Sequence, residues 1–256
     1  MNLFKRFLFE LQEITYLVFA AAAGLLKKPR YIGEMILQMD LIGVGSLPIV
    51  LLTGFFTGGV LVLQTFPTLN YYGAQSEAGR SVALSLIREL GPVLSALMVS
   101  GRIGSSISAE LGSMVVSQQI EAMRALGTDP YRKLVGPRLV ALILMLPILT
   151  VAADVFGITG GGVVASTLYG QAHNVFLTSV RNGITMQDII GGIIKPLCFG
   201  LIIGSISCYK GLSTTGGTVG VGRSTTSAVV LSSIVVIIAD FFLSRGLQHI
   251  LGARVM

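Results

Sequence analysis

The chain has 256 residues, of which 52% are hydrophobic and only 12% charged, and its formal net charge is +6. A soluble globular domain carries about 25% charged residues, so this composition excludes an ordinary soluble protein and predicts an integral membrane protein. The positive charges lie between apolar segments and form no basic stripe interleaved with aromatic residues, which argues against a nucleic-acid-binding protein.

The first 30 residues predict a helix that lies along the membrane surface. Apolar residues recur there at helical spacing, with charged residues between them. This pattern is typical of an amphipathic interfacial helix, and a short transmembrane helix is the alternative. The apolar positions are Phe4, Phe7, Leu8 and Leu11, and the segment ends with Lys27, Lys28 and Arg30.

Five apolar stretches come next, each long enough to cross a hydrocarbon core of about 30 Å. As one helix, the second stretch would be about 55 Å long, so it should project from the membrane or bend, with Gly91-Pro92 as the expected kink. Residues 171–188 are predicted to be a loop. The sequence therefore predicts a single all-α membrane domain with spans at residues 41–63, 81–117, 139–169, 189–209 and 225–243.

Basic residues set the orientation of these spans. With five spans, the N-terminal segment, residues 118–138 and the 210–223 loop lie on one side, which holds eleven Lys and Arg residues against four on the other. The positive-inside rule makes that side cytoplasmic and places the C-terminus in the periplasm.

Glycines recur at a spacing of four within the spans. Such small-xxx-small pairs let helix backbones approach closely, so they predict a tightly packed bundle with a helix–helix dimer contact. The pairs are Gly54/Gly58, Gly157/Gly161 and Gly200/Gly204.

Several catalytic chemistries have no residues to support them. The sequence contains no Gly-x-x-x-x-Gly-Lys-Ser/Thr motif, so ATP must be bound by a separate partner. His173 and His249 have no companions at metal-ligand spacing, and no Ser/His/Asp set suggests hydrolysis. We therefore expect no enzyme activity, no metal and no cofactor in this chain.

The longest cytoplasmic segment contains the most informative motif, Glu121-Ala-Met-Arg-Ala-Leu-Gly127-Thr-Asp-Pro130-Tyr-Arg-Lys133. Gly127 can end one short helix and Asp129-Pro130 can start the next. The motif resembles the Glu-Ala-Ala…Gly coupling element of ABC importer permeases, although Met123 replaces the second alanine; an ordinary turn is the alternative. The resemblance implies that an ATPase contacts Glu121, Ala122, Arg124, Gly127, Asp129, Pro130 and Arg132.

A longer block leads into this motif and resembles the signature of the MlaE permease family. It comprises Arg88-Glu-Leu-Gly-Pro92, Gly101-Arg-Ile-Gly104, Ala109-Glu-Leu-Gly112 and residues 121–138. The resemblance implies an ABC transporter permease of the bacterial inner membrane that moves phospholipid and maintains outer-membrane lipid asymmetry. It also implies a homodimer, a cytoplasmic ABC ATPase, often a small STAS-domain protein, and a periplasmic hexamer of MCE-domain subunits.

The resemblance further implies a phospholipid cavity near the outer part of the first two spans. Apolar side chains would hold the acyl chains, and the charged pair Arg88 and Glu89 would lie near the headgroup. Lys195, beside Pro196 in the fourth span, either lines the same cavity or reaches to the interface. The implied cavity residues are Leu61, Gln64, Leu69, Tyr72, Arg88 and Glu89, and Lys195 is the additional candidate.

Other charged residues in the spans predict a buried network. On an ideal helix, Arg102 and Glu110 fall about 40° to either side of Arg88, and this polar stripe should face protein. Arg102 is expected to pair with Glu110, Asp154 or Asp240, so these four residues form the predicted network.

Two other functions fit the same sequence. A permease for a small polar solute would share the coupling element but need a polar, enclosed site. A membrane scaffold without transport would use the glycine-rich packing but leave the charged residues in the spans unexplained.

Overall fold

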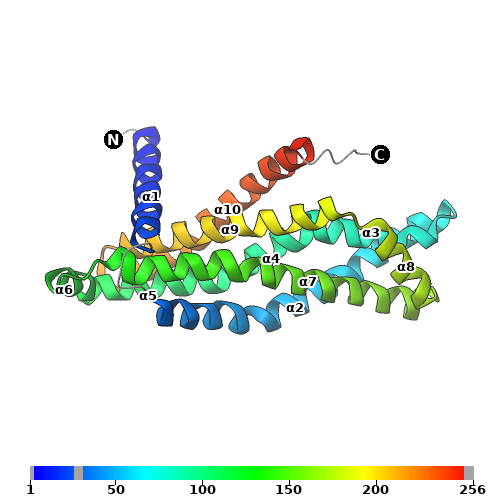
Figure 1. The fold of residues 1–256 in the computed structure, drawn as a ribbon, viewed down its shortest axis with the longest axis horizontal. Coiled ribbons are helices and arrows are strands. Elements are labelled where there is room, and N and C mark those ends of the chain that lie inside the picture. Colours follow the sequence, from blue (N-terminus) through cyan, green and yellow to red (C-terminus); the bar gives the residue numbers. More distant parts are fainter. Residues whose placement is uncertain (1–2, 26–30, 251–256) are drawn as a thin grey trace. The chain divides into compact units, whose positions relative to one another are not determined.

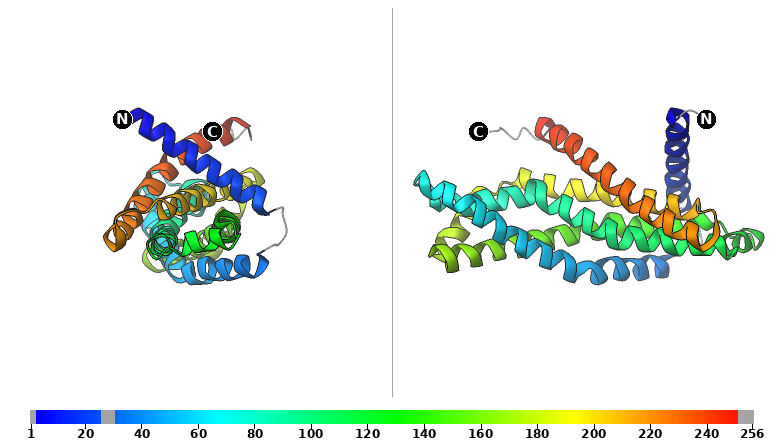
Figure 2. Two further views of the ribbon diagram at one scale, coloured as in Figure 1. Left: turned by 90° about the vertical axis from the view of Figure 1, so that its left-hand side faces the viewer. Right: turned by 180° about the vertical axis from the view of Figure 1, so that it is seen from behind.

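The computed structural model describes residues 3–25 and 31–250. The basic residues Lys27, Lys28 and Arg30 of the predicted interfacial segment lie outside these ranges. The side chains of Phe4 and Phe7 are not among those described. Figures 1 and 2 show that the described part of the chain consists of helices and the turns between them. The prediction of an all-α membrane fold is therefore confirmed.

Short irregular helices separate the long ones in the order of the chain. The long segments begin with α1 (Leu3–Leu25) and α2 (Ile32–Tyr71). The next stretch is built from η1 (Gln75–Glu77), α3 (Ala78–Ser85), η2 (Leu86–Leu90), α4 (Gly91–Val99), η3 (Ser100–Gly104) and α5 (Ser105–Val116). The remainder comprises α6 (Gln119–Ala125), η4 (Tyr131–Val135), α7 (Gly136–Tyr169), α8 (His173–Gly183), α9 (Met186–Leu212) and α10 (Gly217–Ile250).

Five stretches of the described chain are long and apolar enough to cross a membrane. Each contains or closely matches one of the predicted spans, and α1 is not among them. The candidate spans are Ile32–Tyr71, Gln75–Val116, Tyr131–Tyr169, Met186–Leu212 and Gly217–His249.

The chain forms two compact units, and most long helices contribute residues to both. The first unit comprises residues 1–44, 99–145 and 199–236, and the second comprises residues 45–98, 146–198 and 237–256.

In the first unit, α1 packs against the start of the third span. Leu17 and Ala21 of α1 are buried, and the Tyr16 ring meets the Tyr131 ring edge-to-face at 6.4 Å. The amphipathic pattern of the segment therefore buries one face of α1 on this unit.

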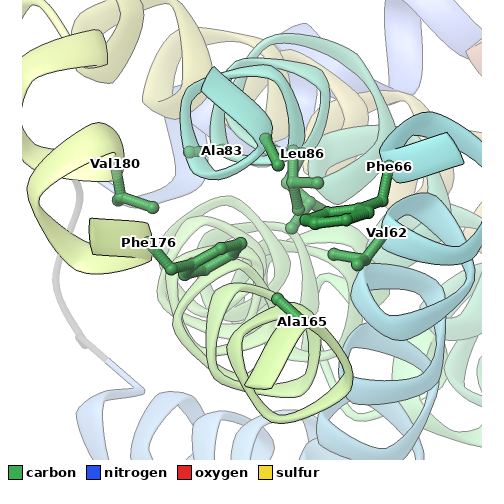
Figure 3. Packing of buried hydrophobic residues seen from close by; sticks show 9 residues of the cluster. Val62, Phe66, Ala83, Leu86, Ala165, Phe176 and Val180 are labelled. Atoms are coloured by element: carbon green, nitrogen blue, oxygen red, sulfur yellow. The ribbon is translucent and has the colours of Figure 1, made fainter. Parts of the chain in front are cut away.

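The second unit is organised around an apolar cluster that includes Val62, Phe66, Leu86 and Phe176 (Figure 3). Phe176 and Val180 point into it from α8, so the prediction of a loop over residues 171–188 is wrong. Two apolar residues one helical turn apart give α8 a face that is buried in the cluster, which stabilises a short helix among polar residues.

Glycines bring α2 and α7 into backbone contact in this unit. A Cβ atom at Gly58 would collide with the carbonyl of Gly157, and one at Gly160 would collide with the carbonyl of Phe55. The predicted glycine pairs at 54/58 and 157/161 therefore pack within the chain.

Candidate functional site

The site begins with a defect in the second span. Pro92 has no N–H, so the carbonyl of Arg88, four residues earlier, loses its usual helical donor. The preceding donor, the Gly91 N–H, reaches back five residues to the Leu86 carbonyl, which makes η2 a π-helical turn. This turn leaves a polar backbone atom of a membrane span available to a side chain.

Lys195 of α9 supplies the missing donor. Its ammonium group donates a hydrogen bond to the Arg88 carbonyl at 2.5 Å and to Glu89 Oε2 at 2.8 Å, and it forms an ion pair with Asp240 Oδ1 at 3.1 Å. The residue is only 3% exposed. Two acceptors from η2 and one carboxylate from α10 therefore compensate a buried positive charge.

Arg88 is held by a second residue of α9. Its Nε atom donates to Asp188 Oδ1 at 2.6 Å, and 43% of the side chain stays exposed. Asp188 Oδ2 accepts hydrogen bonds from the Thr185 N–H at 2.9 Å and the Thr185 hydroxyl at 2.7 Å. Asp188 thus caps the start of α9 with one oxygen and orients the guanidinium group with the other.

These residues surround a cavity of about 60 Å³ in the second unit. Ser244 joins them from α10, one turn after Asp240, and donates to Glu89 Oε2 at 3.2 Å. The cavity therefore offers charged groups of both signs and hydroxyl and amide groups beside a glycine-lined wall. It is lined by Arg88, Glu89, Gln187, Asp188, Gly191, Gly192, Lys195, Ser244, Leu247 and Gln248.

The structure brings Arg88, Glu89 and Lys195 together, but it does not bring the other predicted lipid residues to this cavity. Leu61 and Leu69 pack instead against the apolar cluster of the second unit. Gln64 and Tyr72 of this group are exposed, and the Tyr72 ring meets Tyr71 edge-to-face at 5.2 Å.

The predicted buried network of Arg102, Glu110, Asp154 and Asp240 is not a single network. Arg102 is exposed, and the half-exposed carboxylate of Glu110 forms an ion pair at 2.7 Å with the buried Arg138. The angular prediction failed because the π turns η2 and η3 each add a residue to the helix and rotate the subsequent turns by about 100°.

Asp154 and Asp240 differ in their surroundings. Asp240 pairs with Lys195. Asp154 is buried beside Gly91, and its Oδ1 atom has no hydrogen-bond partner within residues 3–25 and 31–250.

The predicted coupling segment folds in the first unit as two capped helices. Gly127 has a φ of +75°, its N–H bonds to the Arg124 carbonyl, and the Thr128 N–H bonds to the Met123 carbonyl, which together form a Schellman cap on α6. Asp129 Oδ1 then accepts the Tyr131 N–H at 2.9 Å with Pro130 between them.

This segment presents an exposed face. Glu121, Ala122 and Arg124 of α6 are exposed, as are Gly127 and Asp129, whereas Pro130 is buried and Arg132 half-buried. Leu126, which the sequence did not single out, is 82% exposed. Exposed charged side chains and an exposed leucine therefore lie together at the end of this capped helix.

Sequence reasoning also missed Asp188 and Ser244. The pattern Thr185-x-x-Asp188 before an apolar run could have indicated a capping residue at the start of α9. Asp188 and Lys195 are seven residues apart, so they share a helix face. Ser244 carried no comparable signal.

Known proteins resemble the chain over most of its length. Residues 35–245 match the family described as Permease MlaE. A probable ABC transporter permease protein of Rickettsia felis is 42% identical over 227 residues, which cover 89% of this chain and 88% of that protein. A probable ABC transporter permease protein of Synechocystis is 46% identical over 207 residues, covering 81% and 79%.

A plant protein is also similar. TRIGALACTOSYLDIACYLGLYCEROL 1, chloroplastic, of Arabidopsis thaliana is 41% identical over 207 residues, which cover 81% of this chain and 59% of that protein. The family match and the identities to two bacterial permeases together show that the chain belongs to the MlaE permease family.

Proposed function

We propose that this ABC transporter permease moves phospholipid, and that the cavity around Arg88 and Lys195 receives the phosphate of the headgroup. The observation that carries the proposal is the fixed but accessible guanidinium of Arg88. Asp188 binds its Nε atom at 2.6 Å, while 43% of the side chain stays exposed. A guanidinium group held in this way is well suited to bind a phosphate diester.

Two further observations support a lipid over a small polar solute. The cavity is lined by helices that belong to candidate membrane spans, so phospholipid surrounds the protein that contains it. The similar Arabidopsis protein is named after trigalactosyldiacylglycerol, which is a glycolipid. Gln64 and Tyr72, exposed on α2, would extend the site towards the acyl chains when a second copy of the chain packs beside it.

The energy would come from a separate ATPase, as expected for an ABC permease. In our proposal this ATPase contacts the exposed face of α6, and its closure moves η4 and α7 through the capped turn at Asp129. The chain would act as a homodimer in the bacterial inner membrane, with the N-terminus cytoplasmic and the C-terminus periplasmic. A STAS-domain protein and a periplasmic MCE-domain hexamer would complete the complex that maintains outer-membrane lipid asymmetry.

The proposal is tested by purifying the tagged chain with its natural partners from native membranes. Mass spectrometry of the eluate would quantify phospholipid per chain and identify the co-purified proteins. We expect about stoichiometric phospholipid together with an ABC ATPase and an MCE-domain protein, and a loss of most of the lipid in Arg88→Gln.

Arg181→Gln is the matched control, because Arg181 is also exposed and lies on α8 away from the lining of the cavity. Equal lipid content in the Arg88 and Arg181 variants would reject the phosphate-binding role. Recovery of the ATPase with no lipid would favour the small-solute permease, and recovery of neither ATPase nor lipid would favour the scaffold.

A further inference from the structure

The first unit contains a second polar hollow, of about 380 Å³, that the transport proposal does not use. It lies between α1, the end of α9 and the start of α10. Its polar lining consists of Glu10, Lys210, Arg223 and the serines 213, 224 and 227. Phe9 and Tyr209 complete the wall with aromatic rings.

A tight turn builds this hollow. The chain leaves α9 at Leu212 and enters α10 at Gly217, and the turn contains two consecutive glycines with positive φ, +88° at Gly216 and +67° at Gly217. Residues other than glycine rarely adopt this backbone conformation. The reversal places Lys210 and Ser213 opposite Arg223 and Ser227, which are one helical turn apart on α10.

The two basic side chains of the hollow differ in whether a carboxylate neutralises their charge. Lys210 Nζ donates to Glu10 Oε2 of α1 at 2.9 Å and lies over the Tyr209 ring at 5.4 Å from its centre. Arg223 is exposed and forms no ion pair with any residue that the structure describes. The Ser213 hydroxyl donates to the Lys210 carbonyl at 3.3 Å. The hollow therefore combines one uncompensated guanidinium with the hydroxyl groups of Ser224 and Ser227, and these are donors suited to a phosphate.

We propose that this hollow binds the phosphate group of an anionic phospholipid from the leaflet in which α1 lies. Arg223, Ser224 and Ser227 would hold the phosphate, and Lys210 would add long-range attraction. The aromatic side chains suit the boundary between headgroups and acyl chains, where aromatic rings concentrate. The amphipathic α1 supplies one wall of the hollow, so the bound lipid would stabilise the packing of this helix.

The ion pair between Lys210 and Glu10 leads to a second expectation about anion binding. Glu10 brings a negative charge into the hollow, where it opposes an incoming phosphate. Removing this carboxylate should strengthen anion binding, whereas removing Arg223 should weaken it. Opposite effects from two variants of the same hollow would not arise from a general loss of structure.

The experiment measures binding of dihexanoyl phosphatidylglycerol and dihexanoyl phosphatidylcholine to the full-length chain in mild detergent. An Arg88→Gln background removes the contribution of the transport cavity. In this background Arg223→Gln should weaken phosphatidylglycerol binding by about tenfold, since a hydrogen bond to a charged group is lost. Glu10→Gln should strengthen it, and Arg223→Lys should fall between the parent and Arg223→Gln.

Arg181→Gln serves as the control for the loss of one exposed positive charge, and should leave binding unchanged. Equal binding by the Arg223→Gln and Arg181→Gln variants, or equal affinity for the two lipids, would overturn the proposal. Inorganic phosphate is the competing probe. Displacement of the lipid only at phosphate concentrations far above that of the lipid supports a lipid site, whereas tighter binding of phosphate than of the lipid would overturn the assignment to lipid.

Discussion

Lys195 donates its shortest hydrogen bond to the backbone carbonyl of Arg88, at 2.5 Å. This carbonyl is the one that Pro92 leaves without a helical donor. A side chain of α9 thus repairs a backbone defect in the second span, and the same defect positions Arg88 and Glu89 at the cavity.

We predict that Lys195→Met destabilises the folded chain by about 3 kcal/mol, because it removes the buried cation that neutralises two carboxylates and takes the side-chain donor from the Arg88 carbonyl. The affected groups are Glu89 and Asp240, which contact Lys195 at 2.8 and 3.1 Å. Thermal unfolding in detergent would measure the change. Lys133→Met is the control, at a half-buried lysine of η4, and should change stability by less than about 0.5 kcal/mol.

Removing the carboxylates as well should reverse the damage. In a Lys195→Met background, Glu89→Gln with Asp240→Asn should recover most of the lost stability, since no uncompensated charge remains. If the triple variant is no more stable than Lys195→Met alone, the loss comes from packing and the electrostatic explanation is wrong.

Pro92→Ala is predicted to loosen Lys195. The substitution restores a backbone N–H at this position, which would donate to the Arg88 carbonyl and compete with the ammonium group for it. Mass-spectrometric mapping of an amine-reactive label should show several-fold more modification at Lys195, which is almost fully buried in the parent. Pro147→Ala in α7 is the control. Pro147 is also a proline inside a helix, but the carbonyl four residues before it is not an acceptor for Lys195. Equal labelling of the two variants would contradict the proposed competition.

The sequence predicts the membrane fold well and the cavity only in part. Long apolar runs specify the spans whatever the order of the apolar residues within them, because a lipid environment leaves few alternatives to a helix. The π turns interrupt the regular helical spacing that the sequence prediction assumed, and at η2 the carbonyl freed by Pro92 is occupied by Lys195 through a tertiary contact. For this reason Arg102 was predicted on the wrong face, while the local caps at Gly127 and Asp129 were predicted correctly.

Glycine substitutions should separate close packing from helix propensity. Gly58→Ala places a Cβ atom into the Gly157 carbonyl, so we expect a loss of about 2 kcal/mol as α2 and α7 are forced apart. Gly246→Ala in α10 meets no atom within 4 Å and should gain about 0.5–1 kcal/mol from helix propensity. Thermal unfolding of both variants would test this contrast. A similar change in both would mean that the contact between α2 and α7 is not tight.

The last prediction concerns Leu126 at the end of α6. Burying a leucine side chain contributes about 1.5–3 kcal/mol, so if an ATPase covers this residue, Leu126→Ala should weaken their association by roughly tenfold or more. The chain itself should stay folded, since the side chain is 82% exposed. Leu177→Ala on α8 is the control for loss of an exposed leucine.

The measurement is titration of the co-purified ATPase against each variant, combined with ATP-driven lipid movement in vesicles. Charge reversal at Glu121 and Arg124 should also uncouple ATP hydrolysis from lipid movement, because both side chains are exposed on α6 beside Leu126. A Leu126 variant that binds the ATPase as the Leu177 variant does would place the contact elsewhere on the first unit. Unchanged transport in the charge-reversed chain would show that α6 does not transmit the motion.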